Sequence, residues 1–253
     1  YAAHDKNFVE ETLNKFPEKD EIVYLDQETP VSKGSKDATL RAAGAGIDAV
    51  ESILDGSCKN AFCIVRPPGH HACIDKSMGF CVFNNVAVAA HYLINKYSFS
   101  NIAIIDFDVH HGNGTQDIFY NNKNVSYYST HQFPLYPGTG DLNETGVGNI
   151  FNVPLVSGTS SDIYKNLFQE KIINQLKIQK PDFMIISAGF DAHSADPLAN
   201  INLVEKDFSF ITDQLKIIAN NCCEGRLLSM LEGGYDINAL EQSILNHIKI
   251  LQT

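Results

Sequence analysis

Short apolar stretches alternate with longer amphipathic stretches along the whole chain. The short runs have the length and the β-branched or aromatic content of buried strands, and Gly, Pro or Asn bounds them. The longer stretches place apolar residues three and four positions apart, which is typical of amphipathic helices. The predicted strands are Ala61–Val65, Ile102–Ile105, Val125–Tyr128, Phe183–Ile186 and Leu227–Leu231, and the predicted helices are Ala38–Leu54, Asn84–Asn95, Asp162–Ile178, Glu205–Asn220 and Ile237–Leu251.

This alternation predicts an α/β fold of three layers, α/β/α, with a central, mostly parallel sheet. In open sheets of this kind, ligands bind beyond the carboxyl ends of the strands. Chemically reactive residues do follow the predicted strands, so the sequence indicates a catalytic site at this edge of the sheet. The segments are Arg66–His71, Asp106–Gly112, Ser129–His131, Ser187–Asp191 leading to Asp196, and Glu232–Tyr235.

Composition and charge narrow the class of protein. The chain has 253 residues, of which 44% are hydrophobic and 19% charged, so we expect one domain spanning residues 1–253. The formal net charge is −11 and no block of Lys or Arg occurs, which argues against nucleic acid or an anionic membrane as the main partner. The negative charge fits a cationic substrate, although it also serves solubility alone.

Other features concern the location and the ends of the chain. No apolar run approaches the ~20 residues of a membrane span, and no signal peptide opens the sequence. None of the six Cys forms a Cys-x-x-Cys pair, so we expect reduced thiols in a cytoplasmic protein. Because the chain begins at Tyr1 and enters a helical pattern at once, we expect a domain trimmed at its N-terminus, and the C-terminal helices are also short.

Three residues after the second predicted strand have the chemistry of a metal site. Asp106, Asp108 and His110 alternate, so on an extended segment their side chains point the same way. Carboxylates leaving a buried strand are costly unless they are paired or bind metal, and zinc accepts Asp oxygen and His nitrogen. A third ligand must come from elsewhere: Asp196 is our choice and Asp191 its competitor. Three ligands would leave an open position for water.

Two further motifs supply acid–base and oxyanion chemistry. His70-His71 follows a stiff Pro-Pro-Gly turn and could provide a general base and an acid, with Asp106 orienting one imidazole. A His pair on its own is more often structural, but the neighbouring Asp-x-Asp-x-His favours catalysis. Tyr235 follows Gly233-Gly234, and its hydroxyl could donate to an oxyanion, whereas the plainer interpretation is a buried Tyr at a helix entry.

Two loops carry an aromatic residue beside Gly. They are Gly79-Phe80 and the segment from Tyr136 to Gly140. They could wall a narrow apolar tunnel above the metal, or they could be ordinary packed loops. The residue types alone do not separate these alternatives.

With these residues assembled, the sequence closely resembles the zinc-dependent histone deacetylase family, of arginase–deacetylase fold. The matching motifs occur in family order over most of the chain, and jointly they are highly specific. The Asn of the His-His-Gly-Asn-Gly segment and the Gly-Phe-Asp-Ala wording resemble the class II and bacterial histone deacetylase-like amidohydrolase branch. The matching segments are Arg66–Ala72, Gly79–Asn84, Asp106–Thr115, Tyr136–Gly140, Ser187–Pro197 and Glu232–Tyr235.

The resemblance implies a role for each matching residue. It implies His71 as base and acid, and it places Asn113 behind His71 where other branches carry an Asp. It also implies a structural potassium ion held mainly by backbone oxygens. The implied metal ligands are Asp108, His110 and Asp196, and the other implied catalytic residues are His70, Asp106 and Tyr235. The implied potassium site consists of Asp106, Asp108, His110, Ser129 and Thr130. The implied substrate tunnel is lined by Gly79, Phe80, Tyr136 and Gly234, with Asp26 at its rim.

The implied activity is hydrolysis of an N-acetyl amide with release of acetate. Acetyl-lysine in a peptide or protein, an acetylpolyamine and other small acyl-amines all remain open as substrates. The ion would be Zn²⁺, and Fe²⁺ is compatible with two Asp and one His. Rival interpretations are a non-catalytic acyl-lysine binding module and a two-metal ureohydrolase of the same fold. The sequence leaves the oligomeric state open.

Overall fold

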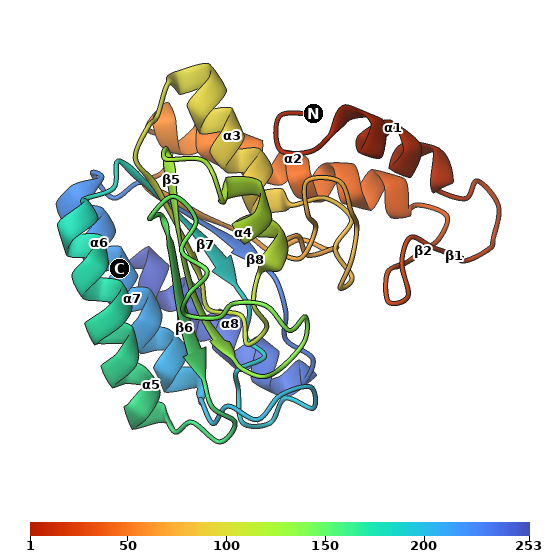
Figure 1. Cartoon of the computed structure of the whole chain (residues 1–253). Helices are drawn as coiled ribbons and strands as arrows, with labels where there is room; N and C mark the ends of the chain where they lie inside the picture. Colours follow the sequence, from red (N-terminus) through yellow and green to blue (C-terminus); the bar gives the residue numbers. More distant parts are fainter.

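A six-stranded sheet runs through the centre of the computed structural model, which describes residues 1–253 (Figure 1). Its strands are β3 (Asn60–Cys63), β4 (Ile102–Asp106), β5 (Val125–Gln132), β6 (Ile150–Leu155), β7 (Phe183–Ala188) and β8 (Leu227–Leu231). The strand order is β3-β8-β7-β4-β5-β6, and every neighbouring pair is parallel. The expected parallel sheet is confirmed.

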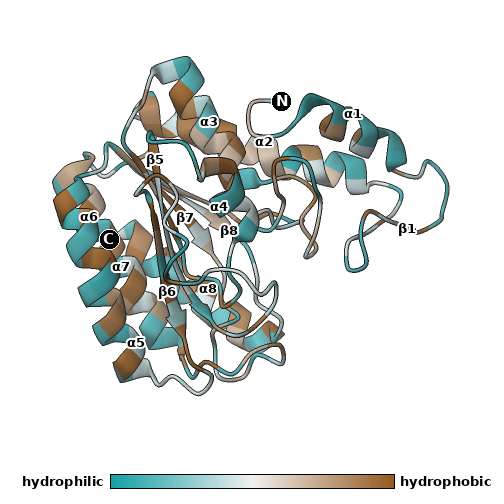
Figure 2. Ribbon diagram, in the orientation of Figure 1, coloured by the Kyte–Doolittle hydropathy of each residue, from teal (hydrophilic) through white to brown (hydrophobic).

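Helices cover both faces of this sheet and complete the three layers (Figure 1). One face packs against α2 (Ser35–Leu54), α3 (Asn85–Tyr97) and the short α4 (Asn113–Phe119). The other face packs against α5 (Ser161–Leu167), the π-helix η1 (Phe168–Ile173), α6 (Asn174–Gln179), α7 (Glu205–Cys222) and α8 (Ile237–Gln252). Figure 2 shows hydrophobic residues on the central strands and polar residues on much of the outer helix surfaces.

Successive residues of one strand explain why both faces need cover. Ile102 and Ile104 of β4 belong to the core shared with α2 and α3, whereas Ala103 and Ile105 belong to the core on the opposite face. All four are almost completely buried. Since each fully buried aliphatic side chain contributes about 1.5–3 kcal/mol, a strand of this kind is stable only between two helical layers.

A small N-terminal unit lies to one side of the sheet (Figure 1). It contains α1 (Lys6–Lys15) and an antiparallel pair, β1 (Val23–Tyr24) with β2 (Pro30–Val31). Phe16 and Val31 from this unit pack with Val82 and Phe83, which belong to the loop before α3. The unit is therefore fixed against the loop that carries Gly79 and Phe80.

The structure differs from the predicted elements at several places, including the following three. Strand β6 was not predicted, because Asn152 and Pro154 interrupt its apolar pattern. Strand β5 continues to Gln132, so the segment 129–131 lies within the strand rather than after it. The predicted helix over 162–178 contains the π-helical turn.

The structure also bears on the expectations about membrane spans and cysteines. None of the helices combines the length and apolar character required to traverse a bilayer. All six cysteines are unpaired thiols.

Candidate active site

The polar segments meet where the parallel strands end. In the sheet register, Asp106 at the end of β4 lies beside Ser129 of β5 and Ser187 of β7. Ala188 of β7 lies beside Leu231 of β8, so the loops that follow these strands leave the sheet together. This is the edge at which open α/β sheets bind ligands.

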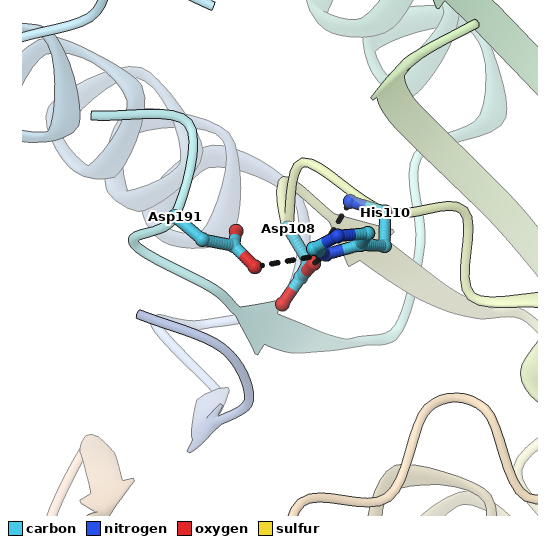
Figure 3. Close-up of side chains that lie close together, drawn as sticks. All are labelled: Asp108, His110 and Asp191. Atoms are coloured by element: carbon cyan, nitrogen blue, oxygen red, sulfur yellow. Dashed lines mark hydrogen bonds and ion pairs between the residues drawn. The ribbon is translucent and has the colours of Figure 1, made fainter. Parts of the chain in front are cut away.

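Asp108 and His110 meet a second carboxylate, that of Asp191, in this edge (Figure 3). His110 Nδ1 lies 3.1 Å from Asp108 Oδ1 and 3.0 Å from Asp191 Oδ2. Backbone groups hold the carboxylates in place: Val109 N–H donates to Asp191 Oδ1 at 2.8 Å, and Gly233 N–H donates to Asp108 Oδ2 at 2.8 Å.

The charges in this group are strongly coupled. Burial alone would lower the pKa of His110, but hydrogen bonds to Asp108 and Asp191 raise it to about 11. Burial and the charge of Asp108 raise the pKa of Asp191 to about 7. Without a metal, a proton on the imidazole therefore offsets part of the carboxylate charge.

These residues fit a divalent metal ion. One ligand atom from each of Asp108, His110 and Asp191 lies within 4.8 Å of the others, and all three residues are buried. Gly189 and Gly233 pack directly on the carboxylate of Asp108, so that a Cβ on either would collide with it. Two buried carboxylates and an imidazole, packed this tightly, are a donor set that Zn²⁺ accepts.

Asp196, the third ligand expected from the sequence, lies outside that three-residue group. Its Oδ2 accepts the backbone N–H of Tyr235 at 2.7 Å, and its Oδ1 accepts that of Leu198 at 3.0 Å. It is 7% exposed and therefore buried. The structure thus brings the competitor, Asp191, next to Asp108 and His110, while Asp196 is tied to the segment that carries Tyr235.

His70 is held in a charged state behind this group. Its Nδ1 lies 3.0 Å from Asp106 Oδ2, which also accepts the hydroxyl of Tyr127 at 2.9 Å. Burial lowers the pKa of His70, but the charges of Asp108 and Asp106 outweigh burial and raise it to about 10. In the metal-free protein, the two carboxylates therefore favour the protonated form of His70.

His71 is neutral, in contrast to its neighbour. Burial and the positive charge of His70 lower the pKa of His71 well below its ordinary value. Its Nδ1 donates to the amide oxygen of Asn113 at 2.8 Å, because that oxygen can only accept. The amide nitrogen of Asn113 points to two sulfur atoms, Cys73 Sγ and Met78 Sδ, each at 3.3 Å. His71 therefore presents an unprotonated Nε2.

A cavity of about 240 Å³ opens onto the two histidines that face it, His71 and His110. Phe80 lies edge-on to the ring of Tyr235, and Tyr136 lies edge-on to the ring of His71. Gly79 and Phe80 both have positive φ, and a side chain at Gly79 would collide with the His71 ring. The lining residues are Glu28, His71, Gly79, Phe80, His110, Leu135, Tyr136, Leu198 and Tyr235.

The molecule also has a larger groove of about 720 Å³, over β6 and the helices α5, η1 and α6. Neither a histidine nor any other expected site residue lines it. We therefore place the chemistry in the smaller cavity despite its size.

The remaining expected residues do not line the cavity. Asp26 caps a turn by accepting the N–H of Glu28, and Gly234 adjoins Tyr235. The hydroxyl of Ser129 pairs with His131, and that of Thr130 pairs with Tyr164. The potassium site expected there through backbone oxygens stays a prediction.

Sequence reasoning missed one structural role at the site. Glu232 is fully buried and accepts the N–H groups of Gly69 and His70 and the hydroxyl of Ser187, at 2.7, 3.1 and 3.0 Å. It therefore fixes the turn that carries both histidines. The sequence did contain a signal for this role, because Glu232 is a charged residue directly after the apolar strand β8.

Comparisons with known proteins point to one family. A family model described as the histone deacetylase domain matches residues 1–251. A probable deacetylase of Archaeoglobus fulgidus is 42% identical over 84% of this chain and 60% of its own length. Histone deacetylase 10, chloroplastic, of Oryza sativa is 42% identical over 81% of this chain and 48% of its own length.

A solved structure of a similar protein has the same fold as this chain. The crystal structure of the HDA15 HD domain superposes with a TM-score of 0.91 at 38% identity, covering 98% of this chain and 70% of that one. The chain therefore spans only about half to two-thirds of several relatives that it matches.

Proposed function

The chain belongs to the histone deacetylase family, and from that premise we propose that it hydrolyses the amide of an N-acetylated amine and releases acetate. The substrate would be acetyl-lysine in a peptide or protein, or an acetylpolyamine. One observation carries the proposal: the adjacent His70 and His71 have pKa values shifted in opposite directions, and His71 lines a cavity together with His110, beside buried carboxylates. Pairs of groups whose pKa values are pushed apart are typical of acid–base catalysis.

The metal would be Zn²⁺, or Fe²⁺ with the same donor types. Asp108 and His110 would hold it together with Asp196, as the family resemblance implies, and Asp191 is the alternative that the geometry offers. When bound, such an ion supplies a Lewis acid that polarises a carbonyl and acidifies water.

His71 supplies the base in this proposal. His71 lines the cavity, and Asn113 fixes the proton on Nδ1, so the unprotonated Nε2 can take a proton from the attacking water. Asp106 orients the ring of His70 through Nδ1, and His70 in its protonated form would stabilise negative charge that develops next to it.

Tyr235 completes the site as a hydrogen-bond donor. Burial, together with the charges of Asp191 and Asp108, raises the pKa of its hydroxyl, so the group remains protonated at every working pH. It can therefore donate to the oxyanion formed when water attacks the carbonyl. His71, now protonated, then delivers its proton to the leaving amine, while Phe80 and Tyr136 hold the alkyl stem of the substrate between them.

Acetate release from an acetyl-lysine peptide tests this proposal. His71→Gln should lower kcat by roughly 10²–10⁴, the usual contribution of a general base. His91→Gln is the matched control, because His91 stacks on Phe119 away from the cavity and should leave kcat unchanged. Turnover of His71→Gln at the level of the control would contradict the assignment of the base.

A further inference from the structure

The loop that carries Tyr136 packs on a group of buried polar side chains that the proposed mechanism does not use. Tyr136 itself lines the catalytic cavity. In the same loop, the hydroxyl of Thr139 pairs with His111 Nδ1 at 2.7 Å. Gly140 lies so close to the rings of His111 and His131 that a Cβ there would collide with both. The position of this cavity wall therefore depends on the two histidines behind it.

A chain of hydrogen bonds continues from His111 to Glu144. His111 Nε2 lies 3.1 Å from Gln116 Oε1, and Gln116 Nε2 donates to Glu144 Oε2. The carboxylate of Glu144 also accepts the backbone N–H groups of Gly140 and Asp141, each at 3.1 Å. Glu144 therefore holds the loop twice, directly through its backbone and indirectly through Gln116 and His111.

Glu144 also fixes the direction of the bonds in this chain. Because an ionised carboxylate only accepts, the NH₂ of Gln116 faces Glu144 and the amide oxygen faces His111. That oxygen also accepts Asn152 Nδ2–H at 2.7 Å, which favours the same orientation of the amide. His111 Nε2 therefore donates to Gln116, and Thr139 closes the chain at Nδ1.

We propose that Glu144 is a positioning residue, which fixes Tyr136 through this chain and so keeps the cavity narrow around the stem of the substrate. His111 and Gln116 are only 1% and 7% exposed, so water does not readily replace a bond that is lost between them. Without the chain, Tyr136 would no longer be held in place relative to Phe80, which also lines the cavity. The inference rests on the proposed hydrolysis and adds the width of the stem as a property that the site selects.

Two acetylated peptides that differ in the width of this stem test the role of Glu144. One contains acetyl-lysine, and the other contains acetylated para-(aminomethyl)phenylalanine, in which a flat ring widens the stem. The inhibition constant of the wide peptide against the acetyl-lysine peptide gives its affinity whether or not it is hydrolysed. The ratio of this inhibition constant to the KM of the acetyl-lysine peptide measures the preference for a narrow stem.

Glu144→Gln should lower this ratio roughly 5-fold, which corresponds to about 1 kcal/mol, as expected for one lost hydrogen bond. The substitution preserves the shape of the side chain, and its oxygen can still accept the two backbone N–H groups. Its NH₂, however, meets the NH₂ of Gln116, so the chain is broken. Glu241→Gln is the matched control, because it removes the same charge from an exposed position of α8 and should keep the wild-type ratio.

Thr139 offers a second pair of variants at the other end of the chain. Thr139→Val removes the hydroxyl that pairs with His111 and should lower the ratio by a similar factor. Thr139→Ser keeps the hydroxyl and should keep the ratio. Because both disruptive changes break one chain, the double variant of Glu144→Gln and Thr139→Val should lose no more than either single variant.

An unchanged ratio in Glu144→Gln or in Thr139→Val, or losses that add in the double variant, would overturn the positioning role. A merely structural role would lower the affinity for both peptides equally and leave the ratio unchanged. If the wild-type protein hydrolyses the acetyl-lysine peptide and the variants keep its ratio, only the inference on Glu144 fails. If the wild-type protein releases no acetate from that peptide, the proposed hydrolysis fails, and the inference fails with it.

Discussion

The third metal ligand can be tested by neutralising two carboxylates one at a time. Asp191 already bonds Val109 N–H and the ring of His110, whereas Asp196 bonds the backbone N–H of Tyr235 beside the cavity. We predict that Asp196→Asn removes a ligand, and that Asp191→Asn removes a partner that orients His110. Both substitutions preserve the shape of the side chain, so each reports on charge.

The two substitutions should weaken zinc binding by different amounts. A four-ligand zinc site contributes about 10–16 kcal/mol, or about 3 kcal/mol for each ligand, so Asp196→Asn should weaken zinc binding at least ~10²-fold. Loss of a carboxylate behind a ligating imidazole costs about 10–100-fold, and we expect the lower end for Asp191→Asn. Asp191→Asn should also destabilise the metal-free protein by about 2 kcal/mol, since it removes a charge-assisted hydrogen bond from His110.

Zinc affinity would be measured at pH 8 by competition with a chromophoric chelator, because Asp191, with a pKa of about 7, is then mostly ionised. Urea unfolding of each metal-free variant gives the free energy of unfolding on the same samples. A greater loss of zinc affinity in Asp191→Asn than in Asp196→Asn would refute the reasoning. The compact group of Asp108, His110 and Asp191 would then be the metal site itself.

Three further predictions concern the oxyanion donor, the packing of the site and the acid stability of the core. Tyr235→Phe should lower kcat by roughly 10²–10³ with zinc content unchanged, and near wild-type turnover would contradict its role. Gly189→Ala should displace the carboxylate of Asp108 and lower zinc content while circular dichroism shows a folded protein; full zinc occupancy would contradict this. His247 is fully buried, and burial lowers its pKa from 6.5 to about 3, so its stabilising contribution is complete above pH 6.5 and is lost as pH falls toward 3. Between pH 6.5 and pH 5 the loss is about 2 kcal/mol in the unfolding free energy, and urea titrations of His247→Gln should lack it.

The sheet and its covering helices could be predicted because burial on two faces leaves a plain pattern. The runs 102–105, 183–186 and 227–231 are apolar at every or nearly every position, and each is a strand in the structure. Strand β6 escaped prediction because it is an edge strand, where Asn152 and Pro154 are tolerated. The hairpin of β1 and β2 was too short to show any period.

The composition of the site was easier to predict than its contacts. Asp-x-Asp-x-His and His-His follow strands, so their meeting at one edge follows from the parallel topology. The position of Asp191 beside His110 depends on how the loop after β7 folds back, which residue types do not encode. Glu28 was missed for the same reason: a two-stranded turn brings it to the cavity from a distant part of the sequence.

Metal dependence of acetate release is the most direct test of the proposed hydrolysis. The protein would be stripped with a chelator, assayed on an acetyl-lysine peptide and on N-acetylputrescine, and then titrated with Zn²⁺. The account predicts that turnover disappears on stripping and returns in full at one equivalent of zinc per chain. Turnover that survives stripping, or that needs two equivalents for recovery, would contradict a hydrolysis that depends on a single ion.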